Sequence, residues 1–129
     1  MQATENGETG EGGAFAPVLE AVRSTGWTST VLDLDGVGDK AAFLGRCADA
    51  LALPGWTGRN WDALADSLKD LSWLPVARGR LLLVARWRGF ADAAPADWRA
   101  AQDVFASAEA HWRGRAEGFA VLLSVDTGR

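Results

Sequence analysis

Apolar positions along the chain follow two periods, and together they predict both strands and helices. Residues 29–35 alternate between apolar and polar side chains, while the nearly continuous apolar runs at 80–87 and 119–125 are typical of fully buried strands. Apolar residues three and four positions apart predict amphipathic helices elsewhere. These helices are expected at residues 14–25, 40–51, 61–70 and 97–113.

The order of these elements predicts an α/β fold. A helical connection separates each strand from the next, and parallel neighbours need a crossover of a dozen or more residues. We therefore expect a three-stranded parallel sheet covered by helices. With 129 residues and 48% hydrophobic content, the chain has the size of one domain, which we place at residues 14–129. Residues 1–13 are polar and glycine-rich, so we expect a disordered tail there.

Composition and charge narrow the possible functions. A formal net charge of −4 argues against direct nucleic-acid binding and favours a basic protein partner. No apolar run reaches the roughly 20 residues that cross a bilayer, so we expect no membrane association. The acidic start does not resemble a secretory signal, so we expect a cytoplasmic protein. Cys47 and His111 are the sole residues of their types and no nucleotide-binding glycine motif is present, so we expect no metal and no cofactor.

The stretch 51–70 holds the most informative candidate site. A loop broken by proline and glycine carries Trp56 and leads directly into a helix with Asp62, Asp66 and Asp70 at positions i, i+4 and i+8. This spacing places the three carboxylates along one helix face, with neighbouring Cβ atoms about 5–6 Å apart. A solvated face is the ordinary interpretation of such a triplet. The adjacent aromatic loop favours a protein interface, in which an aromatic anchor and a cluster of anions meet a basic partner.

An alternative hypothesis is enzymatic. The segment VLDLDGV ends a strand with Asp33 and Asp35, similar to the nucleophile motif of haloacid-dehalogenase-like phosphohydrolases, in which an aspartate attacks phosphorus and magnesium binds between carboxylates. Such enzymes also need a lysine and a further acidic cluster, and the strands at 80–87 and 119–125 do not end in acidic pairs. The simpler interpretation, which we favour, places both aspartates on the open side or the edge of a strand.

Several pieces of the chain resemble a known family. They are LDG at 34–36, ALALPGWTGRNWDALADSLKDL at 50–71 and WRGF at 87–90, followed by a helix and a terminal apolar strand. In order and spacing they are similar to the barstar family, intracellular inhibitors of barnase-type ribonucleases, over about residues 30–125. The resemblance implies a two-layer fold with helices on one side of the sheet, no catalytic activity, and a function of blocking the active site of a basic, extracellular-type ribonuclease or a related toxin.

The resemblance also implies roles for single residues. Asp66 matches the carboxylate that occupies a phosphate subsite of the nuclease, Asp62 matches a second acidic contact, and Trp56 matches an aromatic residue that packs on the enzyme. The partner-binding residues expected on this basis are Trp56, Thr57, Gly58, Asn60, Asp62, Ala65, Asp66 and Asp70.

The chain departs from the family pattern at three of its positions. Ala65 and Leu71 stand where the family has tryptophans, and Ser107 stands where it has an acidic contact. The contact surface is therefore thinner than the family pattern, which implies a different cognate nuclease or weaker binding to barnase. A second hypothesis keeps the fold but gives it another role, as an interaction or antitoxin module for a partner that is not a ribonuclease.

Overall fold

The centre of the protein is a sheet of three parallel strands. In the computed structural model, residue 17 and residues 19–124 are described. Both neighbouring pairs of strands are parallel, and the middle strand of the sheet is also the middle strand in sequence. This confirms the predicted α/β class. The strands are β1 (Trp27–Asp33), β2 (Gly79–Ala85) and β3 (Gly118–Leu123).

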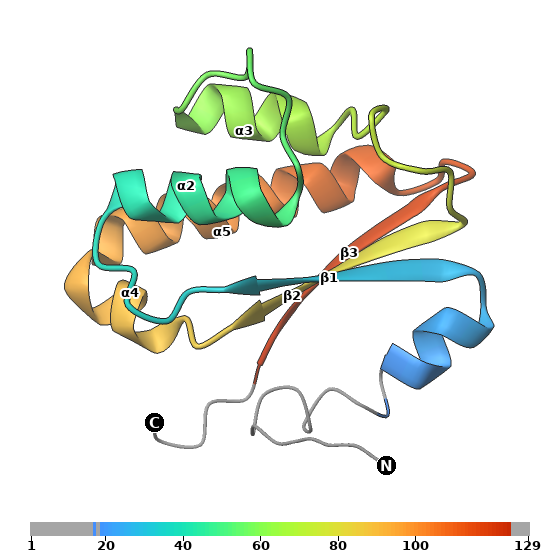
Figure 1. Cartoon of the computed structure of the whole chain (residues 1–129), viewed down its shortest axis with the longest axis horizontal. Coiled ribbons are helices and arrows are strands. Elements are labelled where there is room, and N and C mark those ends of the chain that lie inside the picture. The colour runs from blue at the N-terminus through green and yellow to red at the C-terminus, as the bar shows by residue number, and fades with distance from the viewer. Residues whose placement is uncertain (1–16, 18, 125–129) are drawn as a thin grey trace.

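Four helices lie on one face of this sheet (Figure 1). Both crossovers step to the adjacent strand in the same direction, so right-handed connections carry their helices to the same side. The helices are α2 (Lys40–Ala50), α3 (Trp61–Leu68), α4 (Arg88–Ala93) and α5 (Pro95–Trp112). Within the described part of the chain, no helix combines the length and the apolar character needed to cross a membrane.

The main core lies between the sheet and these helices. Phe43 of α2 and Phe90 of α4 are fully buried and stack with their ring centroids 5.1 Å apart. Leu32 reaches the same core from β1, and α3 contributes Leu64 and Leu68. Full burial of such a side chain stabilises the fold by roughly 1.5–3 kcal/mol, so these contacts fix the position of α3 on the molecule.

The opposite face of the sheet is also partly covered. Residues 19–24 are helical, and Leu19 and Val22 pack against Leu81 and Leu83 of β2. Helices were expected on one side of the sheet only, but this N-terminal helix packs on the other side. The predicted tail at residues 1–13 lies outside the described residues.

The pairing of the three strands begins at Gly79 and Gly118, which have no side chain and so leave room for the Trp27 indole. Gly79 of β2 lies opposite both Trp27 of β1 and Gly118 of β3. A Cβ atom at Gly79 would lie 2.2 Å from the Trp27 ring, and one at Gly118 would lie 2.6 Å from it. Any larger residue at either position would have to displace this ring.

Most predicted boundaries are wrong by a residue or two, and the turns explain why. The predicted strand 29–35 runs from 27 to 33, because Leu34 still bonds to the Ala85 carbonyl but the Val37 N–H then closes a turn on Leu34. Gly36 permits this turn with φ of +79°. The helix predicted from 97 begins at Pro95, which the first turn of a helix tolerates.

Two further differences concern helices. The predicted helix 61–70 ends at Leu68, since the chain turns to a positive φ of 56° at Leu71, whose N–H bonds to the Ser67 carbonyl. Helix α4 was not predicted, because its six residues are too few to show a helical period. It fills the turn between β2 and α5.

Candidate functional site

The acidic helix α3 begins at a well-formed cap. Asn60 has an extended backbone, and its Oδ1 accepts a hydrogen bond of 2.7 Å from the N–H of Ala63. This contact satisfies one of the backbone donors left open at a helix start. Asp62 lies in the first turn, where the positive end of the helix dipole favours a carboxylate.

The far end of α3 is held by a tryptophan of α5. The indole Nε1 of Trp112 donates a hydrogen bond of 2.7 Å to the carbonyl of Leu68. That carbonyl is in the last turn, where no intrahelical donor is available. Because Leu64 and Leu68 are also buried in the core, α3 is fixed along its inner face and at its C-terminal end.

The loop that precedes α3 starts from a strained turn. At the end of α2, Ala52 has a φ of +50°, and the N–H of Leu53 donates to the Ala48 carbonyl at 3.0 Å. This is the pattern of a Schellman motif, in which glycine usually occupies the position with positive φ. The indole Nε1 of Trp73 braces the turn by donating 3.0 Å to the carbonyl of Leu51.

The tip of the loop presents an aromatic residue. A turn closes where the N–H of Thr57 donates 2.9 Å to the Pro54 carbonyl, and Trp56 between them is 82% exposed. The hydroxyl of Thr57 is buried without a hydrogen-bond partner among the described residues. At Gly58, an added Cβ would lie 3.1 Å from the Asn60 amide nitrogen, so a side chain there would press on the helix cap.

The carboxylates of α3 form a pair and not the predicted row of three. Asp62 and Asp66 are both exposed one turn apart on the helix, and among the described residues neither makes an ion pair. The prediction that Asp70 continues this row on the helix is wrong, because α3 ends at Leu68. Its Oδ1 instead accepts a hydrogen bond of 3.3 Å from the N–H of Ser72 in the following turn. The helix therefore offers two adjacent anions beside the exposed Trp56.

The inner side of α3 is occupied by packing. Trp61 lies against Phe43 with ring centroids 5.5 Å apart, and the Nζ of Lys40 lies 5.8 Å from the centroid of the Trp61 ring. Ala65 is half-buried against the core. The small side chain of Ala65 leaves the space beside Asp66 without a large contact group.

The second pair of aspartates is neutralised inside the molecule. At the end of β1, Asp33 accepts a hydrogen bond of 3.0 Å from the Nε of Arg86, and its other oxygen is in contact with Nη2 of the same arginine. Asp35 lies 3.7 Å from the Arg86 Nη1, and Arg46 of α2 donates to the backbone carbonyls of both aspartates at 2.6 and 2.8 Å. Burial by itself would raise the pKa of Asp33, but the hydrogen bonds and the arginine charges outweigh it and lower this pKa below 3.8.

This arrangement gives Asp33 a structural role. A carboxylate held by a guanidinium on two oxygens is poorly placed to attack phosphorus. Within the described part of the chain, no group of three His, Cys, Asp or Glu side chains could hold a metal ion. The geometry therefore gives no support to the phosphohydrolase hypothesis.

Comparison with protein families matches residues 27–124 to the model described as Barstar (barnase inhibitor). The chain belongs to the barstar family. The barstar match runs from the first residue of β1 to the residue after β3, and so includes the whole sheet, the Trp56 loop and α3. It confirms the resemblance noted in the sequence. A search of curated proteins finds no match to the chain.

The departures from the barstar pattern occupy different environments. Leu71, where the family has a tryptophan, is buried to 1% exposure in the core, whereas Ser107 is exposed on α5. Sequence reasoning missed the supports of the site, Trp73 and Trp112. An indole N–H that is taken out of water usually finds an acceptor, and this was the available signal, but the sequence does not say which carbonyl is used.

Proposed function

We propose that this barstar-family protein inhibits a small basic ribonuclease by presenting Asp66 to the phosphate-binding groups of the enzyme. Asp62 supports this contact and Trp56 packs beside it. The observation that carries the proposal is the pair of exposed carboxylates on a helix that is fixed along its inner face and at its C-terminal end. The remaining members of the proposed surface are Thr57, Gly58, Asn60, Ala65 and Asp70.

The electrostatics favour such a partner. Two like charges one turn apart on a helix cost a few tenths of a kcal/mol, and this cost is relieved when arginine, lysine or histidine side chains approach. Because α3 is already ordered, the protein loses little conformational entropy on binding. The partner in this proposal is an extracellular-type ribonuclease, and its inhibition needs no catalytic group and no cofactor.

Titration of a panel of small basic ribonucleases with the protein tests the proposal. We expect stoichiometric inhibition of at least one enzyme, with association that slows as salt is added. Asp66→Asn should weaken inhibition of that enzyme by at least about thirtyfold, the loss typical of a central interface residue. Asp103→Asn is the matched control, since Asp103 is exposed on α5 and loses the same charge. Equal inhibition by both variants would contradict the assigned surface.

A second candidate keeps the surface but changes the partner. With Ala65 and Leu71 the chain lacks two tryptophans of the family pattern, and Leu71 is buried in the core. These observations favour a toxin other than a barnase-type enzyme as the alternative partner. Failure to inhibit any ribonuclease of the panel, together with Asp66-dependent capture of a toxin that is not a nuclease, would favour this candidate.

A further inference from the structure

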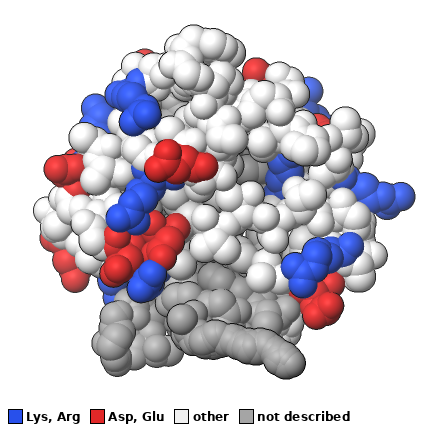
Figure 2. All heavy atoms as spheres, viewed as in Figure 1, with Lys and Arg blue, Asp and Glu red and all other residues white. Residues whose placement is uncertain are grey.

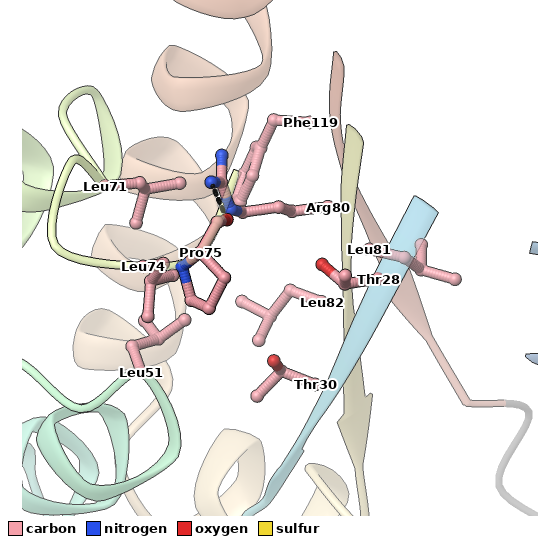
Figure 3. A pocket seen from close by; sticks show the side chains of 10 residues that line it. All are labelled: Thr28, Thr30, Leu51, Leu71, Leu74, Pro75, Arg80, Leu81, Leu82 and Phe119. Carbon is pink, nitrogen blue, oxygen red and sulfur yellow. Dashed lines mark hydrogen bonds between the residues drawn. The ribbon is translucent and has the colours of Figure 1, made fainter. Parts of the chain in front are cut away.

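A pocket of about 210 Å³ lies between the sheet and the turn that follows α3 (Figure 3). It is distinct from the exposed face of α3, since its walls come from the inner face of the sheet, the end of α2 and the turn at Leu71–Pro75. The middle of the molecular face seen in Figure 2 is formed mainly by uncharged residues. The apolar wall is formed by Leu51, Leu71, Leu74, Pro75, Leu82 and Phe119.

One end of this apolar pocket carries a buried cation. The side chain of Arg80 is only 11% exposed, and its Nη2 donates a hydrogen bond of 2.8 Å to the Pro75 carbonyl. Its one acidic neighbour among the described residues is Glu117, whose carboxylate oxygen lies 3.7 Å from Nη1, beyond hydrogen-bond distance. A guanidinium has several further N–H donors, and none of the Arg80 nitrogens is both buried and without a hydrogen-bond partner, so these donors face the open pocket. An anion in the pocket would satisfy them.

Two hydroxyl groups add to the polar side of the pocket. Thr28 and Thr30 project from β1 on the side of Leu82, and in the described part of the chain neither hydroxyl makes a hydrogen bond (Figure 3). Thr28 and Pro75 are exposed, so the pocket is open to solvent between β1 and the turn. An apolar cavity with a few convergent polar groups is the usual form of a small-molecule site.

We propose that this pocket binds a small monocarboxylate with a short aliphatic chain, the carboxylate on Arg80 and the chain against Leu82 and Leu51. A pocket of this size suits a short aliphatic chain of roughly six carbons. The apolar walls disfavour multiply charged anions such as phosphate, because they offer no second cation or donor cluster. The site is independent of ribonuclease inhibition.

The test uses the full chain with hexanoate as the probe and hexanamide as its neutral match. Binding is followed by amide chemical shifts in NMR and by calorimetry. We expect hexanoate to bind in the millimolar range with saturable shifts at Thr28, Thr30 and Leu82, and hexanamide to bind at least about tenfold more weakly. Arg80→Met should cause a similar loss for hexanoate, while Arg99→Met, at an exposed position on α5, should cause none.

A third variant sharpens the assignment. Glu117→Gln removes the competing carboxylate beside Arg80 and should tighten hexanoate binding a few-fold. Equal binding of hexanoate and hexanamide would overturn the proposal, as would the absence of saturable shifts at these three residues at the highest soluble concentration. The comparison of the two probes needs only the unaltered protein, so it decides the matter even if Arg80→Met does not fold.

Discussion

The molecule contains two pairs of closely spaced aspartates, and their surroundings are opposite. Asp33 at the end of β1 and Asp35 just after it meet Arg86 and Arg46. Asp62 and Asp66 lie on α3 without an ionic partner in the described part of the chain. Arginines of the same chain neutralise the first pair, so that pair stabilises the fold. In the proposed function, the charges that meet the second pair come from the partner. The two pairs therefore differ in their neighbouring charges and not in the aspartates themselves, and our proposal rests on this difference.

The largest expected effect separates the two pairs by function. Asp66→Asn should weaken partner binding by at least about 2 kcal/mol and change the free energy of unfolding by less than about 0.5 kcal/mol, because its carboxylate is exposed and makes no ion pair with a described residue. Asp33→Asn should leave binding unchanged within about twofold. Inhibition assays and urea denaturation measure the two quantities. Loss of binding in Asp33→Asn alone would reverse the assignment.

The loop that precedes Asp62 and Asp66 contains the Thr57 hydroxyl, which we expect to destabilise the folded protein. Thr57→Val keeps the shape of the side chain and removes a buried hydroxyl that has no partner among the described residues. We expect the free energy of unfolding to increase by about 1 kcal/mol. If stability falls instead, the hydroxyl has a partner such as an ordered water. A simultaneous loss of binding would place Thr57 in the contact surface.

A slightly smaller change in stability is expected at Ala52, in the turn between α2 and this loop. Ala52→Gly should stabilise the protein by about 0.5–1 kcal/mol, since glycine adopts the positive φ of this position without strain. The matched control is Ala106→Gly, at an exposed position within α5, which should destabilise by about 1 kcal/mol. Thermal unfolding of both variants measures the contrast. A similar loss in both would show that the turn is unstrained.

The smallest expected effect is the pH dependence of the stability that Asp33 contributes through its contact with Arg86. The pKa of Asp33 is lowered in the folded protein, so its contribution is fully present above the ordinary value of 3.8 and is lost as the pH falls through the folded value. Because the side chain is 41% exposed, we expect Asp33→Asn to cost only about 0.5 kcal/mol at neutral pH. Urea denaturation of both proteins between neutral and acidic pH measures this difference, which should vanish in acid. A constant difference would point to lost packing.

Much of the candidate site is predictable because its signals are local. Asn60 caps the helix whose first residue follows it, and the spacing of Asp62 and Asp66 fixes their common face once the helix exists. The prediction that the helix continues to Asp70 was wrong for a tertiary reason. The chain leaves the helix after Leu68 so that Leu71 can enter the core, and this competes with the helical pattern.

The sequence by itself determined the α/β class, the parallel order of strands, the Asn60 cap of α3 and membership of the barstar family. These depend on short-range periodicity, on capping side chains within a few residues and on the fixed length of a crossover. The tertiary structure alone decided that Asp33 pairs with Arg86, 53 residues away, and that Trp112 secures the end of α3. Such contacts form only where the sheet and the packed helices bring distant segments together, and no local pattern encodes that distance.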